Sequence, residues 1–515
     1  MFRSVFFIKH MTMSKLTEDS IEFAKRHIEN YYDSDFFPKA FEFEAIWHSW
    51  DEVKKFLLGS NIGKLRTKHP LAMASKKPSG SYRIVHQLEP IDTIIYTALA
   101  YLIAEKVESV REKKNIACSY RFVVSDGSFF EKNAGFKMFT DMIESLSQQY
   151  QYILVTDITD FYNQIYLHRL NNAIERADPN LKNIADDTER FISSLNDKAS
   201  KGVPVGPAAS IIMSEAVLID IDEYIANFGV QHTRYVDDIR IFSNSKVELE
   251  EILEKLTLYL HENHRLTLAS EKTFIQETTI YAEGVLHNQY EMEKVQIFKT
   301  LEIFNPYSGM TYEKVLVEEK SDLEAHLKYT SEQLLKREFI DLGLARALIR
   351  KAKANRIEFV AEVIFDNFDF FSPVINDVVL YFQSLSSDNW IQKNKEKLIS
   401  IISYTSMRQS MVRYWMEWFF SGNKTLLHLA DIRKFITSGG AIENQALAAL
   451  TLKNVAWVRD YKNRVFYVGE KGKRAILRST KILPKDERDN WLRNIEKNTP
   501  EELDKWIIKW IIETA

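Results

Sequence analysis

The sequence predicts an α+β fold in which a mixed domain of strands and helices precedes an all-α domain. Between residues 59 and 290, short runs rich in Val, Ile, Tyr and Phe have the composition of strands. Past residue 290, apolar residues recur at intervals of three and four, which is the spacing of helices. We therefore expect a helical segment at 1–58, the mixed domain at 59–290, a connector at 291–315 and a helical domain at 316–515.

The helices of the C-terminal half are predicted to stack in succession. Segments such as EKSDLEAHLKYTSEQLL and LGLARALIRKAKA are separated by short polar breaks, including SLSSDN and SGNK. Helices that follow one another across such short breaks are typical of α-solenoids, although the sequence contains no clean repeat.

Composition predicts a globular protein of a reducing compartment. The 515 residues, of which 45% are hydrophobic, are enough for two or three domains with cores of their own. Cys118 is the only cysteine, so no disulfide can form within the chain, and this favours the cytoplasm. No apolar run reaches the length of a membrane span, and the apolar patch at the start is too short for a signal peptide. The sequence leaves open whether Met1, Met11 or Met13 is the natural start.

The most informative motif is the tetrapeptide YVDD at Tyr235–Asp238. It lies between two short β-type runs, so Asp237 and Asp238 are predicted at the turn of a hairpin. Adjacent carboxylates repel each other, and a hard divalent cation such as Mg²⁺ removes that repulsion. The alternative is a solvated turn, in which Asp is common.

A third carboxylate lies about eighty residues upstream, in the segment QYILVTDITDFYNQIYL. Residues 152–156 read as a buried strand, and Asp157 falls where this strand ends. Three convergent carboxylates are what a two-metal phosphoryl or nucleotidyl transfer site needs. The following FYNQIYLHRL could start a helix, so the alternative role for Asp157 is the N-cap of that helix, but Asp160 is the better candidate for that position.

Other segments carry weaker signals. The loop around Gly202, Pro204 and Gly206 precedes a long apolar segment at 211–225 that predicts a helix, and its glycines allow close backbone approach to a ligand. Upstream, KKPSGSYR carries cations around a turn, as a hairpin that contacts a triphosphate would. For these cations, and for Lys272 near a later strand, the alternative is an ordinary solvated surface.

Five segments together resemble the reverse transcriptase family in type, order and approximate spacing. KKPSGSYR resembles the fingers segment, LVTDITDFYNQI the first catalytic palm motif, and GVPVGPAAS the Gly-x-Pro-Gln-Gly motif. YVDD resembles the catalytic hairpin, and LTLASEKT the lysine-bearing motif that follows it. The resemblance covers roughly residues 60–285 and implies a fingers–palm domain.

The resemblance implies a nucleotidyltransferase that uses dNTPs and two Mg²⁺ ions, with Mn²⁺ as an alternative. Tyr162 takes the place of the family's aromatic gate, which clashes with a ribose 2′-hydroxyl and so selects deoxynucleotides; its alternative role is core packing. The implied metal ligands, which are also the catalytic residues, are Asp157, Asp237, Asp238 and the backbone carbonyl of Ile158. The implied nucleotide-binding residues are Lys76, Lys77, Arg83, Tyr162, Gly206 and Lys272.

One departure from the family pattern points to a particular branch. Val205 stands where templated reverse transcriptases carry glutamine, and valine cannot make that side chain's hydrogen bonds. The loop, with Ser210 and Glu215 after it, and the sequence at 119–121 (SYR) resemble the bacterial abortive-infection reverse transcriptases, including prophage-encoded ones. That group lacks the usual thumb and has an all-α HEAT-like helical-repeat domain instead.

Membership of that branch would imply an antiviral, anti-phage function in the bacterial cytoplasm. It would also imply DNA synthesis without a template, started from a protein hydroxyl, so that the single-stranded product stays covalently attached to the enzyme. A homo-oligomer is implied as well. The priming residue would be a tyrosine, and Tyr31 and Tyr32 are candidates because they lie beside a polar break.

The helical half also contains cations that a nucleic-acid strand could follow. Basic residues interleaved with aromatic ones hold single strands without reading their sequence. The alternative is a solvated helix face beside core aromatics. The formal net charge of −4 is low for a protein that grips a long duplex. The candidate residues are Arg346, Arg350, Lys353, Arg459, Lys462, Arg464, Lys473 and Arg474.

Two other functions are compatible with the same motifs. One is a conventional RNA-templated reverse transcriptase of the retron or group II intron type, against which Val205 weighs. The family's primer-grip sequence also has no clear counterpart, the nearest being YAEG at 281–284. The other is a catalytically inactive palm that acts as a nucleic-acid-binding scaffold, against which the three intact aspartates weigh.

Overall fold

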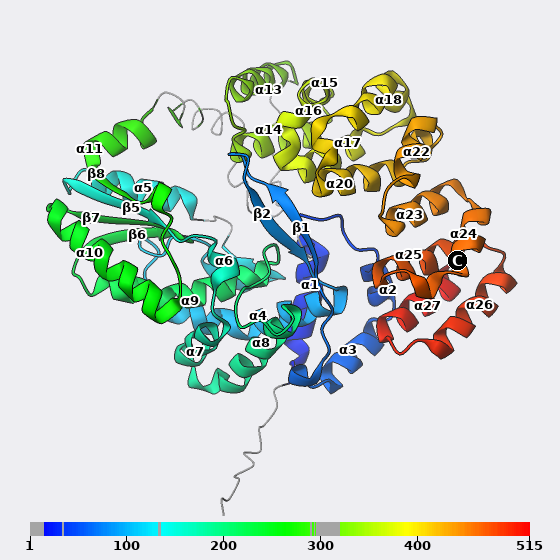
Figure 1. Ribbon diagram of the computed structural model, residues 1–515, viewed down its shortest axis with the longest axis horizontal. Helices are drawn as coiled ribbons and strands as arrows, with labels where there is room; N and C mark the ends of the chain where they lie inside the picture. Colours follow the sequence, from blue (N-terminus) through cyan, green and yellow to red (C-terminus); the bar gives the residue numbers. More distant parts are fainter. Residues whose placement is uncertain (1–14, 33–35, 132–134, 289–290, 293, 295–319) are drawn as a thin grey trace, which may run out of the picture. The chain divides into compact units, whose positions relative to one another are not determined.

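The structure is a computed structural model that describes residues 15–32, 36–131, 135–288, 291–292, 294 and 320–515 (Figure 1). It contains two compact units, each made of several stretches of the chain. The described residues of the first fall within 1–33, 54–71 and 91–288, and those of the second within 34–53, 72–90 and 289–515. The stretches of the two units therefore alternate along the chain, whereas the sequence predicted consecutive domains. The four predicted domain ranges stay a prediction, and most of the connector, like the candidate start residues, lies outside the described residues.

A four-stranded antiparallel sheet forms the centre of the first unit. Its strands follow the order β6 (Gln231–Tyr235), β7 (Asp238–Ser243), β5 (Tyr152–Asp157) and β8 (Phe274–Glu277). β5 is an inner strand, and its Ile153, Leu154 and Val155 are all buried. A strand covered on both faces needs a continuous apolar run. The predicted strand at 152–156 is therefore confirmed, and it extends to Asp157.

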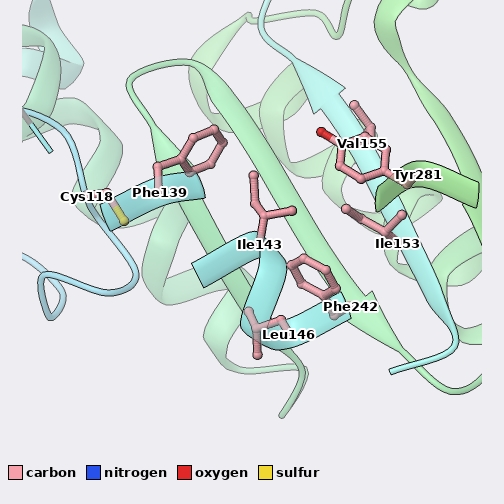
Figure 2. Close-up of a cluster of buried hydrophobic side chains, with 8 residues drawn as sticks. All are labelled: Cys118, Phe139, Ile143, Leu146, Ile153, Val155, Phe242 and Tyr281. Atoms are coloured by element: carbon pink, nitrogen blue, oxygen red, sulfur yellow. The ribbon is translucent and has the colours of Figure 1, made fainter. Parts of the chain in front are cut away.

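Helix α5 (Phe136–Ser147) covers one face of this sheet (Figure 2). Side chains alternate between the faces of a strand, so Asp157 lies on the same face as Ile153 and Val155. Asp238, directly opposite Asp157, shares that face. The apolar core between α5 and the sheet thus ends at the carboxylates of Asp157 and Asp238. Helix α10 (Lys246–Tyr259) also packs on the sheet. The core on the α5 face consists of Cys118, Phe139, Ile143, Leu146, Ile153, Val155, Phe242 and Tyr281.

Two helices are apolar around nearly their whole circumference, α4 (Pro90–Val110) and α9 (Ala208–Ala226). Such helices are buried rather than amphipathic, and the helix predicted at 211–225 is confirmed as α9. Within α9, Glu215 and Asp222 are also buried. The remaining helices and strands before residue 290 include α1 (Glu18–Tyr31), α3 (Trp50–Gly59), α7 (Leu167–Ala177), α8 (Lys182–Leu195), α11 (Thr278–Tyr281), β3 (Phe122–Ser125) and β4 (Ser128–Phe130).

The segment after Asp157 differs from the sequence prediction. FYNQIYLHRL was expected to start one helix, but α6 (Phe161–Gln164) ends at Gln164. Ile165 and the extended Tyr166 separate it from α7. Asp160 was expected to cap this helix. It occupies the N-cap position in a left-handed conformation (φ 49°), but its side chain accepts from Asn163 Nδ2 at 2.7 Å rather than from a helix N–H. The predicted N-cap position of Asp160 is therefore confirmed, but its side chain does not make the capping bond.

The second unit is mainly helical, as predicted. Helices α14, α17, α20, α23, α25 and α27 contact one another in turn, which is the arrangement of a helical stack. None of the described helices is long and apolar enough to cross a membrane. The helices and strands of this unit are α2 (Glu42–His48), β1 (Leu71–Lys76), β2 (Tyr82–Gln87), α13 (Lys320–Leu335), α14 (Leu342–Asn355), α15 (Phe359–Asp366), α16 (Phe368–Phe371), α17 (Ile375–Leu385), α18 (Asp388–Lys393), α19 (Lys395–Ser400), α20 (Ser410–Ser421), α21 (Lys424–Leu427), α22 (Ala430–Thr437), α23 (Ile442–Leu452), α24 (Val455–Lys462), α25 (Glu470–Ser479), α26 (Lys485–Asn498) and α27 (Glu502–Thr514).

Candidate active site

The pairing of β5 with β7 brings Asp157 and Asp238 side by side. The two residues are directly opposite each other at the end of an unbroken antiparallel register that starts at the pair Tyr152 and Ser243. Opposite residues in such a pair have Cα atoms about 4.5–5.5 Å apart. The side chain of Asp157 is 12% exposed, whereas that of Asp238 is 43% exposed. The predicted position of Asp157, at a strand end facing the acidic hairpin, is confirmed.

Asp237 lies in the turn between β6 and β7, beside the same strand end. Its carbonyl oxygen accepts a hydrogen bond from the N–H of Ile158 at 3.3 Å, which ties the turn to the residue after β5. Ile158 is fully buried, and the carbonyl of Asp157 accepts from the N–H of Ala269 at 2.8 Å. The backbone at Asp157 and Asp237 is thus held by hydrogen bonds from Ala269 and Ile158, respectively. The role of the Ile158 carbonyl as a metal ligand stays a prediction.

The negative charges of the three carboxylates disfavour one another. Burial, and then the charges of Asp157 and Asp238, raise the pKa of Asp237 to about 6. Burial also raises the pKa of Asp157, and Asp238 adds to this shift, while Lys272 opposes it. Burial is therefore the main cause of both shifts, and repulsion between the carboxylates adds to it.

Lys272 is the counter-ion of this cluster. Its Nζ lies 2.7 Å from Oδ2 of Asp157, and this ion pair raises the pKa of Lys272 although burial opposes the shift. Lys272 was predicted near a strand, and it ends a short 3₁₀ turn just before β8. The structure thus connects Lys272 directly to the acidic cluster, which the sequence did not predict.

The donor set fits a divalent cation by its chemistry. All three side chains are carboxylates, which are the hard oxygen ligands that Mg²⁺ and Mn²⁺ prefer. A divalent cation would also relieve the repulsion that Asp157 and Asp238 exert on Asp237. In the part of the chain that the structure describes, no three Asp, Glu, His or Cys side chains are gathered closely enough to hold a metal ion. A metal ligated by Oδ2 of Asp157 would have to share that oxygen with Lys272.

Arg240 supports the third carboxylate. Its Nη1 donates to Oδ1 of Asp238 at 3.3 Å, and its Nε donates to the hydroxyl of Tyr281 at 3.1 Å. Its guanidinium also lies over the ring of Phe139, 5.6 Å from the centroid. The α5 core therefore extends through a cation–π contact to the acidic cluster. Residues 278–286, which include YAEG, are helical, and Tyr281 belongs to the core on the α5 face. This position fits a structural role for Tyr281 rather than a primer grip.

Tyr162 lies on α6, immediately after the strand that ends at Asp157. Its side chain is partly exposed, and its hydroxyl accepts from Ser214 Oγ at 3.3 Å. Burial raises the pKa of the Tyr162 hydroxyl, and the charge of Asp237 adds to this shift. The hydroxyl is therefore close enough to the acidic cluster to be affected by its charge. The backbone of Val203, in the Gly/Pro loop, bonds to the carbonyl of Tyr162 at 2.9 Å. In the same loop Gly206 has a φ of +133°, which requires glycine.

The predicted basic hairpin is confirmed as β1 and β2. The N–H of Lys77 donates to the carbonyl of Ser81 at 2.7 Å, and Gly80 has a φ of +88° in the turn. Lys77 and Arg83 are exposed and Lys76 is partly exposed. Their contact with a triphosphate stays a prediction.

Several cations of the predicted nucleic-acid path are already paired with carboxylates. Arg346 and Arg350 lie on one face of α14, as their spacing predicted, and contact Asp377 at 3.4 and 2.8 Å. Burial lowers the pKa of the neighbouring Lys353. Nucleic-acid contact by these three residues stays a prediction. The other paired cations at the surface are Arg459 and Lys462, both with Glu487, and Arg464 with Asp460.

The prediction that Lys473 and Arg474 line the same path is wrong. Arg474 is 3% exposed and donates to the carboxylates of Glu42 and Glu89. Lys473 is also buried, and its Nζ lies 2.6 Å from Oδ2 of Asp504. A buried cation that is neutralised by carboxylates presents no face to a phosphate.

Sequence reasoning missed the roles of Arg234 and Arg240, which flank YVDD in the chain. Both are buried in strands, and Arg234 is fully buried. Arg240 lies among the apolar residues of β7, and a cation in such a strand signals a buried partner, because an isolated buried charge is strongly unfavourable. β6, with the sequence QHTRY, gives no such signal for Arg234. The strand pattern could not identify the partners, which are Glu215 and Asp222 for Arg234 and Asp238 and Tyr281 for Arg240.

Residues 75–298 match the family described as reverse transcriptase (RNA-dependent DNA polymerase). This part of the chain is a reverse transcriptase domain. It contains the sheet, the acidic cluster and Lys272, and the match indicates a nucleotidyltransferase. No curated protein matches the sequence.

The chain is also similar to solved structures of telomerases. Telomerase from Candida albicans, in complex with a fragment of telomeric RNA, is 11% identical, with 72% of this chain and 70% of that one covered and a TM-score of 0.31. Apo telomerase from Candida tropicalis is also 11% identical, with 72% and 74% covered and a TM-score of 0.34. These scores are low, and the domain assignment depends on the family match.

Proposed function

We propose that this protein is a DNA polymerase in which Asp157, Asp237 and Asp238 hold the catalytic metal ions. The observation that carries the proposal is the cross-strand pair of Asp157 and Asp238, with Asp237 in the adjoining turn. When bound, two Mg²⁺ ions would stabilise the attacking and leaving oxygens of an in-line nucleotidyl transfer. The carbonyl of Ile158 would add an oxygen ligand.

The substrates would be dNTPs, selected by Tyr162. An aromatic ring beside the acidic cluster would clash with a ribose 2′-hydroxyl and leave room for deoxyribose. The bond from Ser214 to its hydroxyl and the adjoining Gly/Pro loop would hold the ring in place. By family resemblance, Gly206 would allow the backbone to approach the nucleotide, and Lys76, Lys77 and Arg83 would bind the triphosphate.

Lys272 would assist the leaving group. Its ammonium group is at the cluster through Asp157, so it can neutralise or protonate a pyrophosphate that leaves there. Because the same ammonium group contacts Oδ2 of Asp157 at 2.7 Å, metal binding and leaving-group assistance are coupled at this residue.

The finer proposal is that synthesis needs no template and starts from a protein hydroxyl. The support is the apolar Val205 in place of a glutamine, together with the resemblance to the abortive-infection branch. On this proposal the product is single-stranded DNA attached to the protein, and the enzyme is a homo-oligomer that acts against phage in the bacterial cytoplasm. Tyr31, at the end of α1, and the adjacent Tyr32 are candidate priming residues.

One assay tests these proposals. Purified protein is incubated with Mg²⁺ and labelled dNTPs, without template or primer, and the products are separated on a denaturing gel. Label that migrates with the protein, and is released by protease, is the expected result. A product that forms only when RNA and a primer are added would overturn the finer proposal and support a templated reverse transcriptase.

Variants test the site in the same assay. Asp157→Asn, Asp237→Asn and Asp238→Asn are each expected to reduce synthesis about a thousandfold or more, with unchanged circular dichroism. Asp160→Asn is the matched control, because this exposed carboxylate lies three residues from Asp157 and bonds to Asn163. Full synthesis by any of the three variants would contradict the site assignment. No synthesis by wild type under any condition would contradict the function and favour a scaffold.

A further inference from the structure

Val236, the second residue of the YVDD hairpin, has an unfavourable backbone conformation. Its φ is +54°, in the left-handed region. A β-branched residue there is a genuine outlier, because its Cβ is crowded by the backbone. Such a conformation persists only where the surrounding structure imposes it. Neighbouring groups must therefore impose this conformation on Val236, the residue that precedes Asp237.

Both polar groups of Val236 are held by side chains from outside the turn. Its N–H donates to Oγ of Ser119 at 3.0 Å. Its carbonyl oxygen accepts from Nη1 of Arg234 at 3.0 Å. The two bonds fix the peptide groups on either side of Val236, and so determine its φ and ψ.

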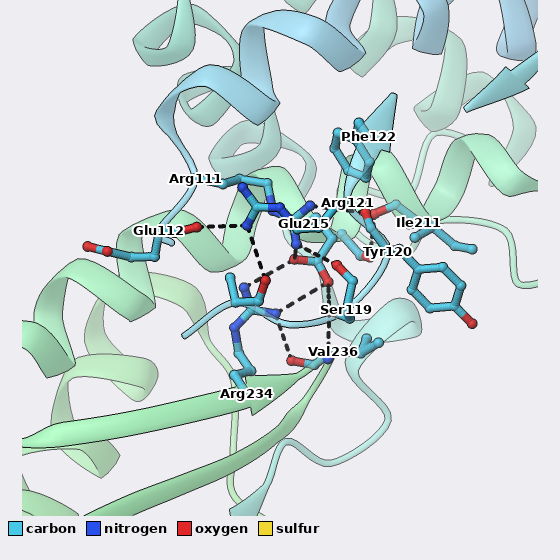
Figure 3. Close-up of polar contacts among 12 residues, drawn as sticks. Arg111, Glu112, Ser119, Tyr120, Arg121, Phe122, Ile211, Glu215, Arg234 and Val236 are labelled. Carbon is cyan, nitrogen blue, oxygen red and sulfur yellow. Dashed lines mark hydrogen bonds and ion pairs between the residues drawn. The ribbon is translucent and has the colours of Figure 1, made fainter. Parts of the chain in front are cut away.

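Glu215 on α9 orients both of these side chains (Figure 3). The hydroxyl of Ser119 donates to Oε1 of Glu215, so its lone pairs remain to accept from Val236. Arg234 donates to both oxygens of Glu215, at 3.3 and 3.1 Å, and this directs its remaining donor to the carbonyl of Val236.

The network is buried and balanced in charge. Ser119, Glu215 and Arg234 are each 0% exposed. Arg111 donates to Glu215 at 2.7 Å, and Arg234 also binds Asp222, so two guanidinium groups face two carboxylates. Ser119, Glu215 and Arg234 each have strong buried partners that they would lose by moving, so this part of the network is rigid.

We propose that Ser119 and Arg234, oriented by Glu215, are positioning residues that hold Val236 left-handed and so direct Asp237 toward Asp157 and Asp238. None of the three touches the reacting atoms in this role. The proposal rests on the polymerase function proposed above. It differs from a purely structural role, because it predicts that the bonds to Val236 affect synthesis more than they affect stability.

The chain offers a closely matched control for Ser119. Ser243, at the opposite end of β7 from the turn, is also buried, at 4% exposure. Its hydroxyl donates to the carboxylate of Glu248 and accepts the N–H of Ser245 at 3.0 Å. Ser119→Ala and Ser243→Ala therefore remove the same kind of bonds, but only the first removes a bond to the hairpin turn.

The experiment compares the two variants with wild type below their melting temperatures. For Ser119→Ala, the rate of nucleotide addition at saturating dNTP should fall roughly 10- to 100-fold, because the catalytic carboxylate is displaced. The dNTP concentration for half-maximal rate should stay the same, and Ser243→Ala should keep the wild-type rate. Equal rates for the two variants, or a loss seen only as weaker dNTP binding, would overturn the proposal.

A second substitution separates conformational restraint from other effects. Val236→Gly removes the Cβ that disfavours a positive φ. If Ser119 acts by holding that conformation, Ser119→Ala should reduce the rate much less in the Val236→Gly background than in wild type. An undiminished effect in that background would mean that Ser119 acts in another way.

A readout without catalysis keeps the two proposals distinguishable. Hydrogen–deuterium exchange of a peptide that contains 235–238 should be faster in Ser119→Ala than in wild type and Ser243→Ala, because the N–H of Val236 has lost its acceptor. Unchanged exchange would overturn the restraint even if the polymerase is active. Faster exchange in a protein that proves inactive would support the restraint and overturn only the proposed function.

Discussion

The ammonium nitrogen of Lys272 lies 2.7 Å from Oδ2 of Asp157, at the strand end where Asp157 faces Asp238. The acidic cluster therefore has a cation of its own before any metal binds. This protein cation lowers the electrostatic repulsion in the metal-free state, and it occupies an oxygen that a metal would use. Metal binding and the Lys272 ion pair should thus compete.

Substitution of Lys272 tests this competition. Lys272→Met is expected to lower the free energy of unfolding of the metal-free protein at pH 8 by about 0.5–1 kcal/mol, a modest amount because the lysine side chain is 56% exposed. Mg²⁺ should then raise the melting temperature of the variant more than that of wild type. The control is Lys137→Met, which breaks a surface pair of the same 2.7 Å length with Asp141. Equal Mg²⁺ effects in Lys272→Met and wild type would contradict the competition.

The pKa of Asp237 predicts how stability depends on pH. Burial and the neighbouring carboxylates raise this pKa from an ordinary value near 4 to about 6, so the folded state binds the proton more tightly than the unfolded state. The free energy of unfolding of the metal-free protein should therefore fall as pH rises from about 4 to 6 and then level off, a total change of roughly 1–3 kcal/mol from this group.

Asp237→Asn should remove that part of the pH dependence. The variant should be more stable than wild type at pH 7.5 in the presence of a chelator, although it cannot support synthesis. Urea denaturation at pH 5, 6 and 7.5 measures the effect, with Asp51→Asn, an exposed residue of α3, as the control. A parallel decline of wild type and Asp237→Asn across this range would show that Asp237 is not the group responsible.

The ring of Tyr162 is expected to exclude ribonucleotides. Tyr162→Ala should lower the preference for dATP over ATP, measured as the ratio of kcat/KM values, by roughly 10- to 100-fold. Tyr162→Phe keeps the ring and loses only the bond with Ser214, so it should retain most of the preference. If Tyr162→Ala and Tyr162→Phe discriminate equally, the ring is not the gate.

Two arginines from one basic stretch should behave differently. Arg474→Met leaves Glu42 and Glu89 buried without their cation, so the free energy of unfolding should fall by about 3–5 kcal/mol. Arg464, whose side chain is 61% exposed, should tolerate Arg464→Met with little change in stability. Thermal denaturation distinguishes the two. Weaker single-stranded DNA binding by Arg464→Met alone would support the remaining part of the predicted path.

The positions of the acidic residues could be predicted because short-range patterns determine them. A run of β-branched residues that ends at Asp157, and two such runs around Asp237, define strand ends without any knowledge of the fold. The break between α6 and α7 was not predictable in this way. FYNQIYLHRL has helical spacing throughout, and the interruption at Ile165 coincides with a bond from the N–H of Gly202 to its carbonyl, from a loop far along the chain.

The buried ion pairs were not predictable for a related reason. Arg474 and Arg464 lie ten residues apart in one basic stretch, and only the tertiary structure places Glu42 and Glu89 around the first. Likewise, Glu215 contacts Ser119, which is 96 residues away in the chain. Sequence patterns indicate which faces are apolar, but the partner of a buried charge depends on which distant elements the fold brings together.

The unbroken register between β5 and β7 has a consequence for changes in chain length. Successive side chains of a strand point to opposite faces, so a shift of one residue would turn Asp238 to the face opposite Asp157. A single residue inserted into or deleted from Ile239–Phe242 would then leave every acidic residue present and the sheet able to form. The carboxylates would no longer meet, so the length of this hairpin is as important to the site as its composition.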